Sequence, residues 1–435
     1  MALVFGAGGS LNLLDCGTQK LPLLEPKPKE NPYWELTSEE KAVEVLGICA
    51  EHLPACSPKE RNASTSYFFP GKEAIPSSGD SCEAGDADVS CALVVSDSDT
   101  AVLKRGLERE CKSELTWEKV FRVLHIVRCQ EFTEWDPKMD DFVHTRLCRF
   151  NIAFFDFEEE SRVEVGPPFC KLAPSDWISL NASVNVISLK IVESDEGYPI
   201  RVFGTVIARD ELDYKCVYLF RRDKENPQVI NSPNDILTLT GPYRALAVTD
   251  YMFFEINLRI IDDAGDRVLS KGVIEHNATS YTKKTKIRHL TSWLSTVELV
   301  YAPVEFAVEA TLAVSILEGP CNFTGKVIAW TTENKENHII LYDSEAAGTE
   351  TGIGDGGSVQ LSRSAVAVQL GEKLVLDISA HGADERFKLT LGQYDQKCVF
   401  KVGPYELQVK VTWTSNVDSR RQNVFTNIEG ILLLR

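Results

Sequence analysis

Three carboxylates cluster in the segment Asp262–Asp266, which joins two strand-like runs and has the sequence Asp-Asp-Ala-Gly-Asp. Ca²⁺ takes about six to eight oxygen ligands, and an acidic loop is one source of them. Further ligands would be available if their loops lay at the same end of a sheet: Asp195, Glu196, Asp210 and Asp213. The spacing of an EF-hand is absent, and an Asp/Gly hairpin turn accounts for the same residues. We therefore predict a turn here and assign no metal ligand.

The densest basic run, Thr-Lys-Lys-Thr-Lys-Ile-Arg-His, covers residues 282–289. Such a run can bind phosphate or act as a nuclear address. Thr285 and Ile287 interrupt it, which favours a solvated loop or a strand edge protected by lysine. The glycine-rich segment 348–357 lacks the Gly-Lys-Ser/Thr of a phosphate-binding loop, so we predict a flexible hairpin loop there.

The histidines are scattered along the chain, at positions 52, 125, 144, 276, 289, 338 and 381. Neither His-x-His, His-Glu-x-x-His nor Gly-x-Ser-x-Gly occurs, so the metal and hydrolase signatures that sequence can reveal are missing. A catalytic triad assembled from distant residues would leave no such signature. From the sequence we assign no catalytic, cofactor-binding or metal-binding residue and expect no cofactor.

The 12 cysteines are widely and irregularly spaced, and no Cys-x-x-Cys occurs. A zinc site needs converging ligands, usually from close pairs, so none is predicted. In a cytosolic protein these thiols are expected to be free. Cys216 lies in an apolar, strand-like run and is expected to be a small core residue.

The N-terminus has no Lys or Arg before its apolar stretch, which Gly6, Gly8 and Gly9 interrupt. A secretory signal needs a basic start and a continuous apolar core, so we expect a protein that is not secreted but cytoplasmic or nuclear. No stretch of about 18 apolar residues predicts a membrane span. The Asn-x-Ser/Thr sequons are then chance matches, at Asn62, Asn181, Asn277 and Asn322.

Charge limits the classes of partner. The 435 residues include 46 Lys and Arg against 64 Asp and Glu, a net charge of −18. This acidity argues against nucleic acid and against anionic lipid surfaces, both of which attract basic footprints. The expected partner is a protein or a small ligand. With 43% hydrophobic residues, the chain has enough apolar material for real cores.

Residues 1–115 are an acidic, low-complexity region. Within it, residues 57–100 are rich in Ser, Gly, Asp, Glu and Pro without periodicity, which predicts disorder. The capping-box pattern Thr37-Ser38-Glu39-Glu40 begins a candidate helix over 38–51, either a docking element or a marginal helix with no partner. A second, lead-in helix is predicted over 115–129 from the helical spacing of its apolar residues.

Alternation of apolar and polar residues with period two predicts antiparallel strands in the rest of the chain. It occurs in Tyr251–Ile261, across residues 304–316, and from Leu407 to Trp413. On the first of these, Phe254, Ile256 and Leu258 face the core, opposite Glu255 and Asn257. We predict that they are buried beside a second group on the sheet faces: Val308, Leu312 and Val314. Gly-Pro punctuation between many short strands favours a mainly β fold of antiparallel sandwich or barrel-like modules.

Two modules are predicted, residues 116–300 and 301–435, and they resemble a tandem repeat. Gly204-Thr-Val-Ile-Ala matches Gly325-Lys-Val-Ile-Ala, and two further pairs of segments keep nearly the same offset. The similar segments at Asp213–Tyr218 and Asp395–Phe400 break this offset and are treated as coincidence. A glycine inside a strand marks a bulge or a close approach, so we expect each glycine to open a bulge or to lie under an aromatic ring. The expected rings are Phe253 or Phe254 in the first module and Trp330 or Phe387 in the second.

Several longer segments resemble a known family. Phe203–Asp223, Leu237–Val248 and Phe254–Leu258 are similar to the core of a plant domain of unknown function that is expanded in grasses, here over 180–275. In some relatives this domain is fused to a ribosome-inactivating domain, an rRNA N-glycosidase. No Glu-Ala-x-Arg segment of that enzyme occurs here, so the chain resembles the form without the enzyme. The family has no established activity, and no functional residue transfers.

The sequence thus favours a non-catalytic binding or interaction protein. The resemblance to proteins fused to toxins adds an association with plant defence. The alternative is an unrecognised enzyme with a site at the loop ends of the β modules. A deep pocket with converging titratable groups would favour the enzyme, and a flat surface or an exposed strand edge would favour the binder.

Overall fold

The computed structural model describes residues 117–262, 265–279, 284–346, 349, 351–352, 354–383 and 386–417. Phe121–Arg435 form one compact unit. The predicted disordered segment 57–100 and the candidate helix 38–51 lie outside the described residues. The predicted lead-in helix is α3 (Trp117–Glu131), in which Leu124 is buried.

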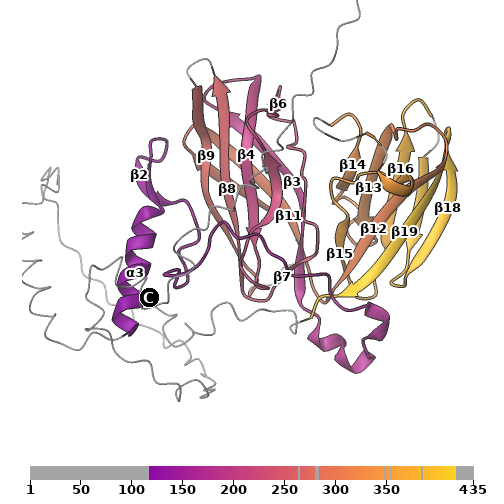
Figure 1. Cartoon of the computed structure of the whole chain (residues 1–435), viewed down its shortest axis with the longest axis horizontal. Coiled ribbons are helices and arrows are strands. Elements are labelled where there is room, and N and C mark those ends of the chain that lie inside the picture. The colour runs from indigo at the N-terminus through magenta and orange to yellow at the C-terminus, as the bar shows by residue number, and fades with distance from the viewer. Residues whose placement is uncertain are drawn as a thin grey trace, which may run out of the picture. The chain divides into compact units, whose positions relative to one another are not determined.

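The described strands form antiparallel sheets, as the alternating patterns predicted. The hairpin of β1 (Thr133–Asp136) and β2 (Asp141–His144) comes first. A first sandwich follows, with one sheet of order β10-β11-β3-β7 and another of order β5-β4-β8-β9, in which β6 also pairs with β4 (Figure 1). The bounds are β3 (Ala182–Ser194), β4 (Ile200–Arg209), β5 (Val217–Arg222), β6 (Gln228–Ile230), β7 (Leu246–Val248), β8 (Tyr251–Asp262), β9 (Gly265–Asn277), β10 (Lys286–Ser292) and β11 (Ser295–Val304).

A second sandwich contains sheets of order β15-β12-β19-β18 and β14-β13-β16-β17. Its strands are β12 (Ala307–Glu318), β13 (Gly325–Thr331), β14 (Ile339–Asp343), β15 (Ala365–Gln369), β16 (Leu374–Ala380), β17 (Arg386–Leu391), β18 (Gln396–Val402) and β19 (Tyr405–Ser415). Short 3₁₀ turns complete the described elements: η4 (Phe169–Lys171), η5 (Pro174–Ser179) and η6 (Asp355–Gly357).

The two sandwiches share one strand order. The strands β3, β4, β8 and β11 of the first sandwich correspond to β12, β13, β16 and β19 of the second. With this correspondence, corresponding strands are neighbours in the same order in both sandwiches. The register agrees as well, because Val206 pairs with Ile256 and Val327 pairs with Ile378. This equivalence supports the tandem repeat. The similar segments Asp213–Tyr218 and Asp395–Phe400 do not keep the sequence offset of the repeat. They lead into β5 and β18, which do not correspond to one another, so their similarity is coincidental.

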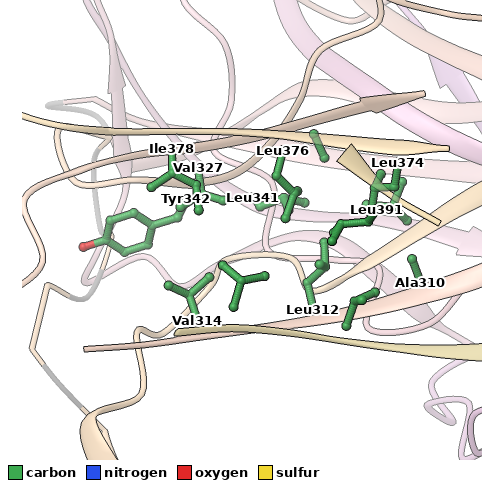
Figure 2. Packing of buried hydrophobic residues seen from close by; sticks show 14 of the residues in the cluster. Ala310, Leu312, Val314, Val327, Leu341, Tyr342, Leu374, Leu376, Ile378 and Leu391 are labelled. Atoms are coloured by element: carbon green, nitrogen blue, oxygen red, sulfur yellow. The ribbon is translucent and has the colours of Figure 1, made fainter. Parts of the chain in front are cut away.

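Each sandwich has its own hydrophobic core. Phe254, Ile256 and Leu258 belong to the first core. Figure 2 shows part of the second, where Leu312 and Val314 of β12 face residues of the opposite sheet such as Leu341 and Ile378. The two groups predicted to be buried beside one another are therefore both buried, but in separate cores.

The single strand suggested by alternation over 304–316 is in fact two. β11 ends at Val304, Phe306 adopts a positive φ of 42°, and β12 starts at Ala307. The alternation continues through this break, so it could not reveal that the chain leaves one sandwich and enters the other. β11 also extends past residue 300, where the boundary between modules was expected.

Buried polar contacts join the two sandwiches. The side chain of Asn185 on β3 donates to the carbonyl of Ala367 on β15 at 2.7 Å and accepts from its amide at 2.9 Å. Arg363, only 3% exposed, donates to the carbonyl of Val186 at 2.7 Å and to that of Ile340 at 2.8 Å. Burial lowers the pKa of Arg363 to about 10.

Candidate functional site

A buried ion-pair network covers part of the outer face of β8. Glu255 is 5% exposed and accepts hydrogen bonds from Arg209 at 2.7 and 2.9 Å. Arg146 and the Leu147 amide donate to it at 3.2 and 2.8 Å. Burial alone would raise the pKa of Glu255, but the two guanidiniums outweigh it and lower the pKa. The polar face of β8 is therefore not all solvent-exposed, because the segment around Leu147 lies over it.

A second network centres on Arg244 and Asp210, both fully buried, which are joined by hydrogen bonds of 2.6 and 3.0 Å. Arg244 also donates to Ser161 Oγ at 2.9 Å, and Ser161 donates to Asp213 at 2.8 Å. Burial raises the pKa of Asp213. Burial would lower the pKa of Arg244, but Asp210 reverses this and the net pKa is raised. These charges hold the segment at Ser161 against the first sandwich.

The carboxylates considered for calcium lie at opposite ends of β4. Asp195 and Glu196 precede this ten-residue strand, whereas Asp210 and Asp213 follow it, a separation of roughly 33 Å along the strand. Asp195 accepts a hydrogen bond from Lys138 at 2.8 Å, and Glu196 binds Arg267 through both oxygens at 2.9 and 2.6 Å. At the predicted turn, Asp262 pairs with Gly265 across the β8–β9 hairpin. The hairpin lies at the Asp195 end of β4, because Ile260 pairs with Val202, so Asp210 and Asp213 cannot join the other carboxylates.

Three other potential metal ligands lie close together in the second sandwich. Ligand atoms of Asp343, Glu345 and His381 are all within 4.8 Å of one another. Asp343 is already paired with Lys326 at 2.8 Å, and His381 Nδ1 lies 3.2 Å from Glu345. Since these contacts satisfy the groups without an ion, we assign no metal site to them.

The basic run has become an edge strand over most of its described part. Lys286, Arg288 and His289 belong to β10, which lies at the edge of its sheet, and Ile287 is 57% exposed. His289 faces Glu298 of the neighbouring strand at 3.3 Å. The described part of the glycine-rich segment contains η6, and the bridge between Asn322 and Gly352 ties it to the rest of the sandwich.

The six cysteines within the described residues are all free. Cys216 is buried, as predicted, and its Sγ lies 3.0 Å from the Phe157 carbonyl, to which it donates. Burial raises the pKa of its thiol, which keeps it protonated and unreactive.

A cleft of about 280 Å³ lies at one end of the first sandwich, where β3 and β10 begin and β7, β9 and β11 end. Both sheets contribute to it, together with the residues that follow η5. Its apolar lining includes Leu180, Ala182, Val248, Ala278 and Pro303. Its polar lining includes Asn181, Ser183, His276, Lys286 and Glu305.

Three of these polar side chains are almost fully buried and have an atom without a hydrogen-bond partner in the part of the chain that the structure describes. They are His276 Nε2, Asn181 Nδ2 and Ser183 Oγ, in residues that are 5%, 6% and 0% exposed. Leaving a buried polar group unsatisfied costs roughly 1–3 kcal/mol, so such groups are uncommon. Other atoms of this kind occur in the described part of the chain, such as Trp413 Nε1 and Thr414 Oγ1, but they do not line this cleft.

The imidazole of His276 is neutral near pH 7. Burial, helped by the nearby cations of Lys286 and Arg288, lowers its pKa to about 4. Its Nδ1 lies 3.2 Å from the hydroxyl of buried Tyr301, and the two rings meet edge to face at 5.1 Å. The contact with Tyr301 fixes the ring and leaves Nε2 as the atom without a partner.

A second cleft, of about 200 Å³, lies between the two sandwiches. Two amide side chains of its lining already have partners. Asn185 accepts a hydrogen bond from the Ala367 amide, and Asn337 forms hydrogen bonds of 3.0 and 2.9 Å with Thr285. The side chains of Asn185 and Asn337 therefore help to hold the two sandwiches together.

Sequence reasoning did not find the first cleft. His276 was noted only as one of the scattered histidines, and Asn181 only as a sequon. About 95 residues separate the two in sequence, and no local spacing signals their proximity. The structure places His276 in the interior opposite Met252, a position at which a polar residue needs a partner.

None of the described helices is long and apolar enough to cross a membrane. The molecule is a tandem antiparallel β-sandwich protein with a cleft at the strand ends of its first sandwich. A family model described as a domain of unknown function (DUF6598) matches residues 183–411, more than half of the chain. The chain belongs to this family, and the match extends over both sandwiches.

The search of curated proteins found no match. Among solved structures, human GIVD cytosolic phospholipase A2 is similar at 7% identity and a TM-score of 0.20, over 55% of this chain and 30% of that one. The C2A and C2B domains of extended-synaptotagmin 2 are similar at 7% identity and a TM-score of 0.20, over 60% of this chain and 96% of that one. This chain thus spans under a third of the phospholipase, and at these scores neither similarity bears on function.

Proposed function

We propose that this protein is a non-catalytic binding protein and that its ligand occupies the cleft at the strand ends of the first sandwich. Two buried, unsatisfied polar groups in the wall of that cleft, on His276 and Asn181, carry the proposal. A ligand that reached them would supply the hydrogen bonds that the described residues do not. The volume of about 280 Å³ lies just below the range of about 300–1,000 Å³ that is usual for small-molecule sites.

The absence of catalysis is part of the proposal. Strongly perturbed titratable groups are candidates for catalysis when they lie in a cleft. Here Glu255, Arg244 and Asp213 are engaged in internal networks outside the cleft, and only His276 combines a shifted pKa with a place in its wall. An enzyme with its site at these loop ends is the alternative, and it predicts turnover that is lost in His276→Gln.

We further propose that the natural partner is a small ligand or a protein, and neither nucleic acid nor a membrane, since the net charge is −18. The proposed location is the cytoplasm or nucleus. The resemblance to a grass-expanded plant domain fused in relatives to ribosome-inactivating enzymes extends the proposal to a plant protein of the defence response. Transcript and protein levels after pathogen challenge test that extension.

The binding proposal is tested by NMR on the full chain with labelled alanine and isoleucine methyl groups. Ile178, Ala182 and Ala278 line the cleft and report on its occupation by a fragment library. Ala278→Phe should block binding, whereas Ala313→Phe, at an exposed position of the second sandwich, should leave it unchanged. Fragments that bind equally to wild type and Ala278→Phe would contradict the proposal.

A further inference from the structure

The unsatisfied groups of the cleft are suited to one kind of ligand atom. The Nδ2 of Asn181 is a donor only. Ser183 alternates with Ala182 and Val184, which face the first core, so its hydroxyl lies on the other face of β3 and is not counted here. If the Tyr301 hydroxyl donates to His276 Nδ1, the proton of the neutral imidazole resides on Nε2, which is then a donor as well. Two donors in the wall of one cleft, from His276 and Asn181, match an acceptor group.

The charges in and near the cleft favour an anion with a single charge. Lys286 lines the cleft, and both Lys286 and Arg288 act on the imidazole of His276. Glu305 also lines the cleft and would repel a doubly charged group such as a phosphate monoester. A carboxylate carries one charge and two acceptor oxygens, so it satisfies the donors at the smallest cost in repulsion.

The remaining lining is apolar. Val248 belongs to the first core, and Ala278 and Pro303 add apolar surface beside the polar groups. Leu180 also lines the cleft but packs in the second core. A ligand with a small hydrocarbon body would remove this surface from water, which is the main source of affinity in small-molecule sites.

We infer that the cleft binds a small organic monocarboxylate. Its carboxylate accepts hydrogen bonds from His276 and Asn181 near the ammonium of Lys286, and its hydrocarbon body packs against Val248 and Ala278. This inference rests on the proposed function, because it names the ligand class of the same cleft.

The test compares three probes of similar shape on the full-length protein: benzoate, benzamide and phenyl phosphate. The methyl signals of Ile178, Ala182 and Ala278 give the dissociation constant of each. Benzoate is expected to bind at least tenfold more tightly than either of the others. Lys286→Gln should weaken benzoate binding at least fivefold, while Lys284→Gln, at an exposed position outside the cleft lining, should not change it.

His276→Gln should also weaken benzoate binding, but it alters a buried residue, so Lys286→Gln and the probe series carry the decision if that variant does not fold. Benzamide or phenyl phosphate binding as tightly as benzoate overturns the monocarboxylate inference and leaves the cleft as a binding site. An unchanged affinity for benzoate in Lys286→Gln also overturns it. If neither the three probes nor the fragment library shifts the cleft methyls, the proposed function fails together with the inference.

Discussion

Gly204 and Gly325 occupy equivalent places in the two sandwiches, each against a backbone carbonyl of the adjacent strand. A Cβ on Gly204 would lie 2.2 Å from the oxygen of Asn257, and a Cβ on Gly325 would lie 2.1 Å from the oxygen of Ser379. Both strands also carry a register irregularity just beyond the glycine, at Val206/Ile207 and Val327/Ile328.

The expected close approach is therefore present, but the suggested rings are not among the nearest atoms. The backbone itself approaches Gly204, and Phe323 approaches Gly325, in place of Trp330 or Phe387. Both glycines thus allow the same close approach of a backbone carbonyl from the adjacent strand.

Gly204→Ala and Gly325→Ala should each lower the free energy of unfolding by at least about 2 kcal/mol, because a methyl group overlaps a backbone atom that cannot move alone. Gly204→Ala should cost more, since its φ of 113° adds strain. Gly371→Ala is the control: its φ is 86° but nothing lies within 4 Å, so only roughly 1–2 kcal/mol is expected. Urea denaturation measures all three, and equal losses would mean that the close approach is not decisive.

Phe254→Ala should lower the free energy of unfolding by about 3–5 kcal/mol, because its fully buried ring leaves a cavity in the first core. The ring also contacts Tyr301, at a centroid distance of 5.2 Å. Asn257→Ala, at an exposed position of the same strand, should change the stability by less than about 0.5 kcal/mol. A loss below about 1 kcal/mol for Phe254→Ala would contradict the assigned core.

Glu255→Gln should cost about 3–5 kcal/mol at pH 7, because Arg209 is left buried without its counter-charge. The pKa of Glu255 is lower in the folded state than its ordinary value of 4.5. Its stabilisation is therefore complete above about pH 4.5 and is lost as the pH falls through the folded pKa. Chemical denaturation between pH 7 and pH 3 should show a steeper loss for wild type than for the variant. Glu275→Gln, which breaks an exposed pair with Arg149, should cost at most about 1 kcal/mol.

Titration of His276 should give an apparent pKa of about 4 by NMR. Its ordinary value is 6.5, so the unfolded chain binds this proton at a higher pH than the folded protein does. The contribution of His276 to stability should therefore fall as the pH drops from about 6.5 to about 4. His276→Gln should flatten this part of the stability profile, and an unchanged profile would show that the imidazole is accessible to water when folded.

The parts of the fold that follow from local pattern were predictable. Strict alternation predicted β8 and β19, since each keeps one face in a core over its whole length. The burial of Glu255 was not predictable, because its partners Arg209 and Arg146 lie 46 and 109 residues away in sequence. Only the folded chain shows that a polar face of β8 is covered.

The candidate site could not be predicted from the sequence for the same reason. A cleft is made by strand ends from both sheets, and in this one His276 and Asn181 each have an atom without a partner among the described residues. Sequence patterns reveal which residue types are present. Whether a buried donor finds an acceptor depends on the tertiary placement of backbone groups, which a single sequence does not encode locally.

The Arg363 guanidinium, which reaches from the second sandwich to the carbonyl of Val186 in the first, bears on whether either sandwich could stand alone. A copy of the second sandwich on its own would leave that charged group without one of its acceptors, and a copy of the first would lose the partner of Asn185. Each sandwich therefore depends on the other to satisfy a buried polar group. The smallest piece of the chain that keeps these hydrogen bonds contains both sandwiches, and the one family match likewise runs across both.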